Sequence, residues 1–215
     1  MKLHLPITLR RTLLSLLLPV AGISPSMGTD LFENSEETLS FSNNSRRFYY
    51  DLNSSDPPTL LLSFQNNQSI EFLNNSIEKS NGAAISVIPM GYGNSKGQVA
   101  FSGNAGSIKF INNTTTNDGG AIAGGWLGLA FENNLGEIRF ESNHAGAQGG
   151  AISGRSGNVF TFQDNNNIIF LNNSITALDS TSDNYSSVGG AIYTCGTVQF
   201  DGNNQVVFTD NNAQS

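Results

Sequence analysis

The chain repeats one pattern of apolar and polar positions along most of its length. In each copy, a Phe has an apolar residue two places before it and an Asn three places after it. The pattern is complete in one stretch, which holds Phe131-x-x-Asn134, then Phe140-x-x-Asn143, then a Gly-Gly-Ala-Ile tetrad that ends at Ile152. Apolar residues at a spacing of two lie on one face of a β-strand. The pattern therefore predicts short, half-buried strands that end near each Asn.

Five copies of this pattern follow one another, and the first Phe of each copy advances by 37, 30, 31 and 38 residues. Such self-similarity indicates a repeat protein with insertions. The ten Phe-Asn pairs are Phe64 and Asn67, Phe72 and Asn75, Phe101 and Asn104, Phe110 and Asn113, Phe131 and Asn134, Phe140 and Asn143, Phe162 and Asn165, Phe170 and Asn173, Phe200 and Asn203, and Phe208 and Asn211. The full tetrads are Gly119, Gly120, Ala121 and Ile122; Gly149, Gly150, Ala151 and Ile152; and Gly189, Gly190, Ala191 and Ile192.

Each copy holds three predicted strand segments, two that end in Phe-x-x-Asn and one built on the tetrad. A strand of about five residues cannot bury its apolar face alone, so the copies must stack. We predict an all-β, right-handed parallel β-helix of about five coils with an N-terminal cap, with coils about 4.8 Å apart. A β-propeller fits less well because its blades need four strands and about forty residues. In a β-helix, Phe and Ile point inward, and Asn, which tolerates left-handed backbone, turns the corners. The small Gly-Gly-Ala residues then leave room beside the bulky Phe.

Three regions are expected along the chain. Residues 1–26 form a predicted signal peptide, because three basic residues and an apolar run that is too short to span a bilayer precede the first acidic residue, Asp30. Residues 27–60 are a predicted cap, since a solenoid needs cover at its open end. Residues 61–215 are the β-helical repeat domain, with insertions at 88–96 and 177–188 that should project as loops.

Charge and composition suit an extracellular β-solenoid better than a helical cytosolic enzyme. The formal net charge is −7, and it becomes −10 once the three basic residues of the signal peptide are removed. That balance argues against nucleic acid as a partner, because phosphates need a basic face. No stretch beyond the signal is long and apolar enough to predict a membrane span of the chain's own.

The residues needed for catalysis or metal binding are scarce. His4 and His144 are the only histidines, too few for a zinc site or a histidine-based triad. Asp164, Asp201 and Asp210 follow motif Phe residues and could align, as a carbohydrate-active enzyme requires of its carboxylates, but a solvated corner is the preferred interpretation. We predict no catalytic residue, metal or cofactor. Cys195 is the single cysteine, which in an exported chain predicts either a buried thiol or an intermolecular disulfide.

The two motifs together, behind a signal peptide, resemble the chlamydial polymorphic outer membrane proteins over Leu62 to Asn211. The resemblance implies an autotransporter with a signal peptide, a β-helical passenger and a C-terminal outer-membrane barrel. It also implies adhesion to a host-cell receptor, in which both motifs are implicated. The candidate adhesion residues are then the three full tetrads and the Phe and Asn residues from Phe101 to Asn211.

The repeats break off before the fifth tetrad, because central tetrads begin nine residues after the second Phe and the chain stops at Ser215. We therefore expect a truncated passenger without a barrel. The predicted function is a surface-exposed or secreted bacterial adhesin fragment, with possible self-association and a location at the outer membrane, at the cell surface or outside the cell. The alternatives are a structural envelope protein cross-linked through Cys195 and a β-helical carbohydrate-active enzyme.

Overall fold

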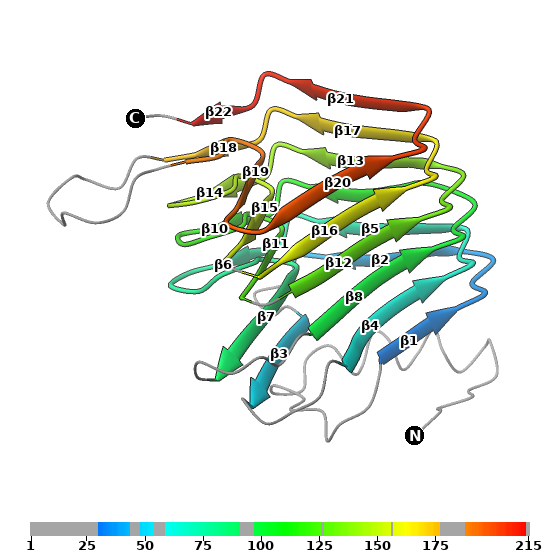
Figure 1. Cartoon of the computed structure of the whole chain (residues 1–215), viewed down its shortest axis with the longest axis horizontal. Coiled ribbons are helices and arrows are strands. Elements are labelled where there is room, and N and C mark those ends of the chain that lie inside the picture. Colours follow the sequence, from blue (N-terminus) through cyan, green and yellow to red (C-terminus); the bar gives the residue numbers. More distant parts are fainter. Residues whose placement is uncertain are drawn as a thin grey trace, which may run out of the picture.

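The computed structural model describes residues 30–43, 48–53, 59–90, 97–125, 127–155, 157–176 and 188–213. Across these ranges the chain winds as successive β-strands around a stack of coils (Figure 1), and every strand pairing is parallel. The predicted all-β parallel β-helix is confirmed. The predicted signal peptide, residues 91–96 of one insertion and residues 177–187 of the other lie outside the described residues. No helix in the described ranges is long and apolar enough to cross a membrane.

The strands that carry the motif Phe residues form two six-stranded sheets. Sheet A holds the strands of the first Phe in each copy: β1 (Asp30–Glu33), β4 (Thr59–Gln65), β8 (Gly97–Ser102), β12 (Leu127–Glu132), β16 (Val159–Gln163) and β20 (Thr197–Asp201). Sheet B holds those of the second Phe: β2 (Thr38–Ser42), β5 (Ser69–Leu73), β9 (Ile108–Ile111), β13 (Glu137–Glu141), β17 (Asn167–Leu171) and β21 (Gln205–Thr209).

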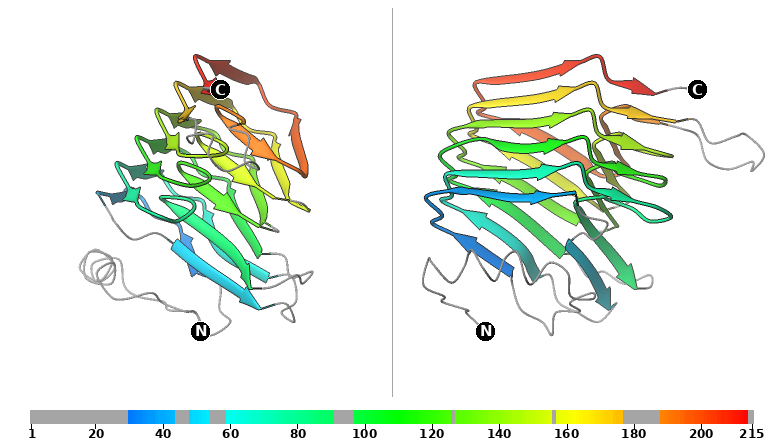
Figure 2. Two further views of the ribbon diagram at one scale, coloured as in Figure 1. Left: turned by 90° about the vertical axis from the view of Figure 1, so that its left-hand side faces the viewer. Right: turned by 180° about the vertical axis from the view of Figure 1, so that it is seen from behind.

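Two five-stranded sheets complete the coil. Sheet C carries the tetrad Ile residues: β3 (Phe48–Asn53), β7 (Ile85–Met90), β11 (Ile122–Gly124), β15 (Ile152–Gly154) and β19 (Ile192–Thr194). Sheet D lies between sheets B and C along the chain: β6 (Ser76–Ile77), β10 (Thr114–Thr115), β14 (His144–Ala145), β18 (Ser174–Ile175) and β22 (Asn212–Ala213). The chain passes through the sheets in the order A, B, D, C and then enters sheet A again one level higher (Figure 2).

Sheet D corrects the prediction of three segments per copy. Its strands are two residues long, so they carry no apolar alternation that could reveal them in the sequence. They are strands only because each pairs in parallel with the same two positions of the next coil, as Thr114 does with His144. Each complete coil therefore has four sides.

Six coils can be counted on sheet A, and we number them from coil 1 (β1–β3) to coil 6 (β20–β22). Coil 1 falls within residues 27–60, the predicted cap. Its strands pair in parallel with coil 2, and Phe32 and Phe41 align with Phe64 and Phe72. These residues therefore continue the coil architecture, and their role as a cap stays a prediction.

The core consists of two columns of Phe rings. Pairing aligns Phe101 with Phe131 in sheet A and Phe110 with Phe140 in sheet B. Their ring centroids lie 4.6 and 4.8 Å apart, and the rings are nearly parallel. Between the columns the rings meet edge to face, as Phe131 and Phe140 do at 5.9 Å and 82°. Edge-to-face contact is a favoured aromatic geometry, so each column supports the other.

The left-handed turn residue is not the motif Asn, as the sequence had suggested, but the residue before it. Asn112, Asn133 and Ser142 have φ values of 55°, 54° and 53°, and Gly103 fills the same position with φ 62°. Asn, Asp and Gly are the residues that adopt this conformation at least cost, which explains why the position is so often one of them. The motif Asn that follows is thereby turned into the coil interior, where it is buried.

The buried Asn side chains form two continuous amide ladders along the stack. Asn134 Oδ1 accepts the backbone N–H of Asn104 at 3.1 Å and its Nδ2–H at 2.8 Å. The Nδ2 of Asn134 donates to Phe101 O of the coil below at 3.0 Å, and also to Asn165 Oδ1 of the coil above at 2.8 Å. One ladder runs through Asn67, Asn104, Asn134, Asn165 and Asn203, and the other through Asn75, Asn113, Asn143, Asn173 and Asn211. Each amide thus satisfies polar groups that burial would otherwise leave unpaired.

Replacing one Phe of a ring column by Ala tests which side chains of a strand point into the stack and which point outward. Phe140 is fully buried between two stacked rings, so Phe140→Ala should lower the free energy of unfolding by about 3–5 kcal/mol. Glu137 lies on the outer face of the same strand, where its Oε1 lies 3.3 Å from Nη1 of the partly exposed Arg139. Glu137→Ala should therefore cost less than about 1 kcal/mol. Urea denaturation of both variants gives the comparison, and equal losses would contradict the register.

Candidate functional site

The motif residues that the resemblance assigns to adhesion lie mostly inside the coil stack. The tetrads at 119–122 and 149–152 are buried, and so are the motif Phe and Asn residues from Phe101 to Asn173. In the tetrad at 189–192, only Ala191 is buried and its neighbours are half-buried. The motifs therefore build the scaffold, and a partner of the folded chain can reach the sides of the stack or its ends.

Each tetrad closes a narrow lobe that the chain makes between sheets B and C. The first glycine has left-handed backbone, with φ of 66° at Gly119 and 61° at Gly149. The second glycine lies where two stretches of backbone come together. A Cβ on Gly120 would stand 2.2 Å from Gly150 O and 2.6 Å from the backbone N of His144. The glycines of the tetrad are small because they approach backbone, so the prediction of room beside a Phe is wrong for them. Ala121 and Ala151 do lie in the core cluster that holds the Phe rings.

The outer face of sheet B differs from the motif core because its residues change from coil to coil. One row aligns Glu71, Lys109, Arg139, Ile169 and Val207. A second row aligns Leu73, Ile111, Glu141, Leu171 and Thr209. All of these side chains are half-buried except the exposed Thr209. We call this set of ten residues the sheet-B face, a flat outer surface that mixes apolar and charged groups.

The charges on the sheet-B face are largely paired with one another. Lys109 Nζ lies 2.9 Å from Glu71 Oε1 in the next coil. Arg139 Nε lies 2.6 Å from Glu141 Oε2, and this hydrogen bond is the main reason that the pKa of Arg139 is raised above its ordinary value. Arg139 also meets Glu137, its other neighbour on the strand. The face therefore presents oriented charges between apolar side chains.

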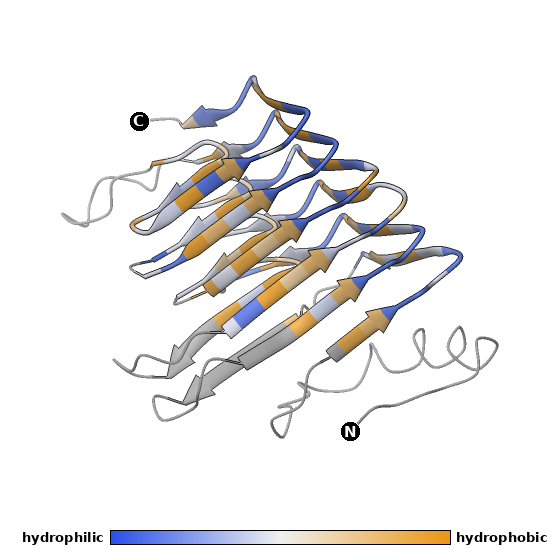
Figure 3. Cartoon of the chain, turned by 45° about the vertical axis from the view of Figure 1, so that its right-hand side comes forward, coloured by the Kyte–Doolittle hydropathy of each residue, from blue (hydrophilic) through white to orange (hydrophobic). Residues whose placement is uncertain are grey.

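The sheet-B face does not stand out in the repeat pattern of the sequence. Its apolar members stand beside motif Phe residues, where alternation predicts polar groups: Leu73, Ile111 and Leu171 follow Phe directly, and Ile169 and Val207 precede it. Hydrophobic residues at positions expected to face water are the signal that could have found it. The outer face of sheet A is more polar at the matching position, with Gln65, Ser102, Glu132, Gln163 and Asp201. Figure 3 shows polar residues gathered where the strands of sheet A end.

A second cluster of polar side chains, apart from the sheet-B face, lies beside sheet C. Arg155 Nη2 stands 3.6 Å from Asp118 Oδ2. Burial raises the pKa of the Asp118 carboxyl above its ordinary value, while the charge of Arg155 opposes that shift. Close by in the next coil, the Tyr193 hydroxyl lies 3.3 Å from Cys195 Sγ, and this hydrogen bond raises the pKa of Tyr193. Cys195 itself is exposed.

The one histidine in the described ranges is engaged by two hydroxyl groups. His144 Nδ1 lies 3.0 Å from Ser174 Oγ, and Nε2 lies 2.8 Å from Thr176 Oγ1. Partial burial lowers the pKa of His144. No cluster of three or more His, Cys, Asp or Glu side chains that could hold a metal ion occurs among the described residues. Asp164, Asp201 and Asp210 are exposed, and Asp164 and Asp210 have left-handed backbone at the corners.

Two of these coils match a known family of repeats. A sequence profile of the Chlamydia polymorphic membrane protein repeat matches residues 107–125 and residues 137–155. Each match runs from a sheet-B strand through the buried Asn, the lobe and the tetrad to the end of a sheet-C strand, in coils 3 and 4. No curated protein and no solved structure gives a significant match.

The chain therefore carries repeats of the chlamydial polymorphic membrane protein family, and the resemblance seen in the sequence is confirmed. The family is associated with the chlamydial outer membrane and cell surface, which supports a broad assignment of this chain to exported proteins.

Two glycines, Gly120 just before β11 and Gly128 within β12, test the role of the tetrad. Gly120→Ala should lower the free energy of unfolding by about 1–3 kcal/mol or more, as overpacking does, because the new Cβ meets backbone that cannot move without shifting a coil. At Gly128 the nearest heavy atom would stand 3.7 Å from the added Cβ, so Gly128→Ala should change stability by less than about 0.5 kcal/mol. Thermal or urea unfolding measures both. A tolerated Gly120→Ala would show that the lobe has room to open.

Proposed function

We propose that the chain is a non-enzymatic, surface-exposed or secreted passenger of adhesin type, and that it attaches to a host-cell receptor through the sheet-B face. The observation that carries the proposal is the burial of the motif residues within repeats of an outer-membrane family. Because the motifs hold the coils together, the contacts with a receptor fall to the residues that point outward and differ between coils.

The sheet-B face has the chemistry of a protein contact surface. Contact surfaces bring apolar side chains and Arg together, and their polar rims hold hydrogen-bonding groups. Here Arg139 lies between Lys109 and the apolar Ile169 on adjacent strands, and its own carboxylate partners hold it in place. One of these partners, Glu141, lies between Ile111 and Leu171. A side chain that is already oriented loses less conformational freedom when a partner binds.

Cell binding by a single-residue variant tests this proposal. Beads coated with the purified chain should attach to epithelial cells more than beads coated with an unrelated acidic protein. Leu171→Glu places a charge within the sheet-B face and should reduce attachment several-fold. Gln163→Glu adds the same charge on the outer face of sheet A in the same coil, so it should leave attachment unchanged.

Circular dichroism of both variants checks that the β-structure is kept. Equal attachment by the two variants would contradict a role for the sheet-B face. Attachment that persists after unfolding of the chain would contradict adhesion by the folded passenger altogether.

A structural envelope role is the second candidate, and the exposure of Cys195 favours it. An exposed thiol in an exported chain is available for an intermolecular disulfide. Chlamydial envelopes that contain this chain would then give a high-mass band on non-reducing gels. That band should disappear when a reductant is added, and it should be absent in the Cys195→Ser variant. Beads coated with Cys195→Ser should attach to cells as well as beads coated with the unaltered chain. A band that persists in Cys195→Ser would rule out this thiol as the cross-link.

A further inference from the structure

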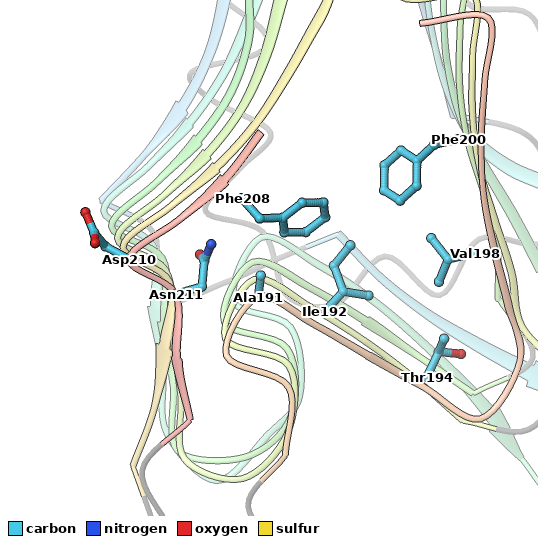
Figure 4. A pocket seen from close by; sticks show the side chains of 8 residues that line it. All are labelled: Ala191, Ile192, Thr194, Val198, Phe200, Phe208, Asp210 and Asn211. Carbon is cyan, nitrogen blue, oxygen red and sulfur yellow. The ribbon is translucent and has the colours of Figure 1, made fainter. Parts of the chain in front are cut away.

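The charged and apolar side chains of the sheet-B face alternate in a regular way between coils 4 and 5. Figure 4, in which the coils lie behind one another, shows Phe208 of β21 pointing into the stack, so the residues on either side of a motif Phe point outward. In coil 4 these outward residues are Arg139 and Glu141, and in coil 5 they are Ile169 and Leu171. One coil therefore carries opposite charges in the two rows of the face, and the next coil is apolar in both.

This arrangement is self-complementary about a two-fold axis that runs parallel to the stack. Such an axis sets two copies face to face with their coils at the same level, and it places the row of Arg139 opposite the row of Glu141. Arg139 of each copy then faces Glu141 of the other, and Ile169 faces Leu171. Each contact occurs twice, as in every two-fold interface.

Two copies in antiparallel order would not match. A two-fold axis across the stack at coil 4 keeps each row opposite itself, so Arg139 would face Arg139 and Glu141 would face Glu141. Like charges that meet at an interface disfavour association. An axis between coils 4 and 5 would instead set each charge against Ile169 or Leu171, which removes water from the charge without giving it a partner. The pattern of the face therefore selects the parallel order.

Both charged groups of coil 4 keep bonding capacity for a second copy. Arg139 uses Nε toward Glu141 Oε2 and Nη1 toward Glu137 Oε1. Within the described part of the chain, Nη2 of Arg139 and Oε1 of Glu141 take part in no ion pair. Because a guanidinium has five N–H donors, Arg139 can hold its own carboxylates and a carboxylate of a second copy at the same time. These ion pairs also orient the charges beforehand, which reduces the entropy lost on pairing.

The size of the sheet-B face limits the strength of such a pair. The face extends about 19 Å along the stack, and its strands are about 17 Å long. Its flat area is therefore about 320 Å², whereas a stable interface buries about 800 Å² on each partner. Pairing should be weak and reversible, and it should depend on the local concentration of the chain.

We propose that the sheet-B face pairs with the sheet-B face of a second copy of this chain in parallel order. Arg139 and Glu141 form two reciprocal ion pairs across the axis, and Ile169 and Leu171 pack beside them. The pair depends only on the complementarity of the face. One consequence rests on the proposed function: a receptor and a second copy cannot occupy the same face, so pairing would hold the attachment surface in reserve at high concentration.

Charge reversal, followed by sedimentation velocity, tests the pair. The unaltered chain should shift from monomer to dimer as its concentration rises. Arg139→Glu and Glu141→Arg should each raise the dissociation constant of the dimer at least about tenfold, because each change sets like charges against one another twice. The double variant, Arg139→Glu with Glu141→Arg, restores opposite charges across the axis and keeps the net charge of the chain. It should therefore pair again.

Two controls separate this contact from a general effect of charge. Glu132→Arg makes the same change as Glu141→Arg directly after a motif Phe in the same coil, but on the outer face of sheet A, so it should leave the dimer unchanged. An equimolar mixture of the two single variants should form a mixed dimer, since each row of one then meets an opposite charge on the other. Circular dichroism checks that every variant keeps its β-structure.

Three results would overturn the proposal. Self-association that is unchanged in both single variants would place the contact elsewhere on the chain. Failure of the double variant to pair, when both single variants also fail, would contradict the reciprocal ion pairs. A chain that stays monomeric at every concentration, yet attaches to cells and loses attachment with Leu171→Glu, would overturn the pair and leave the proposed function standing.

Discussion

The spacing between hydrogen-bonded strands is the constraint on which the rest of this structure depends. Neighbouring strands lie about 4.8 Å apart, so every side chain of one coil sits directly above its counterpart in the coil below. A position inside the stack therefore favours a residue that packs well on its counterpart, and a residue that pairs well with another copy of itself can repeat along the whole stack. Phe meets this condition by stacking, with centroids 4.6–5.1 Å apart from coil 2 to coil 6. Asn meets it because its carboxamide has both a donor and an acceptor.

The same condition explains how far the sequence could predict the fold. Inward positions repeat because they must match their neighbours, so Ile108 and Phe110 reveal a strand, an inner face and a stacking register by pattern alone. Thr114 and Thr115 reveal nothing of the kind, since a two-residue strand is too short for alternation and pairs only because the coils above and below place it there. The fourth side of the coil was therefore missed.

The corner turns show a second limit to predicting this structure from the sequence. Asn112 and Asn113 are adjacent and identical in type, yet Asn112 is exposed with left-handed backbone, while Asn113 is buried in the ladder. Either residue type fits either role, so the sequence alone could not separate them. What does separate them is the pattern of replacement. Gly103, Ser142, Asp164 and Gly202 occur at the first position, whereas every one of the ten motif pairs keeps Asn at the second.

The candidate surface was the least predictable part, for a related reason. Outward side chains face solvent and are free to vary, so the sheet-B face carries Glu71, Lys109, Arg139 and Ile169 in successive coils. No repeated residue type marks such a row, and its chemistry becomes visible only when parallel pairing sets residues 30 to 38 positions apart side by side. Invariance within this chain therefore marks the scaffold, and variation marks the outward surface.

The amide ladders also give the stack a direction. Each Asn presents its Oδ1 to the coil below and needs the Oδ1 of the coil above, so the two faces of a coil are not equivalent. In the first described coil the ladder position holds Ser35 in place of Asn, and its N–H still donates to Asn67 Oδ1 at 3.1 Å. The same change at Asn134 would strand two donors of Asn104 and the carbonyl of Phe101 in the interior, each costing about 1–3 kcal/mol. Asn is therefore required wherever one coil lies on another, and the ladder links the order of the coils to their hydrogen bonding.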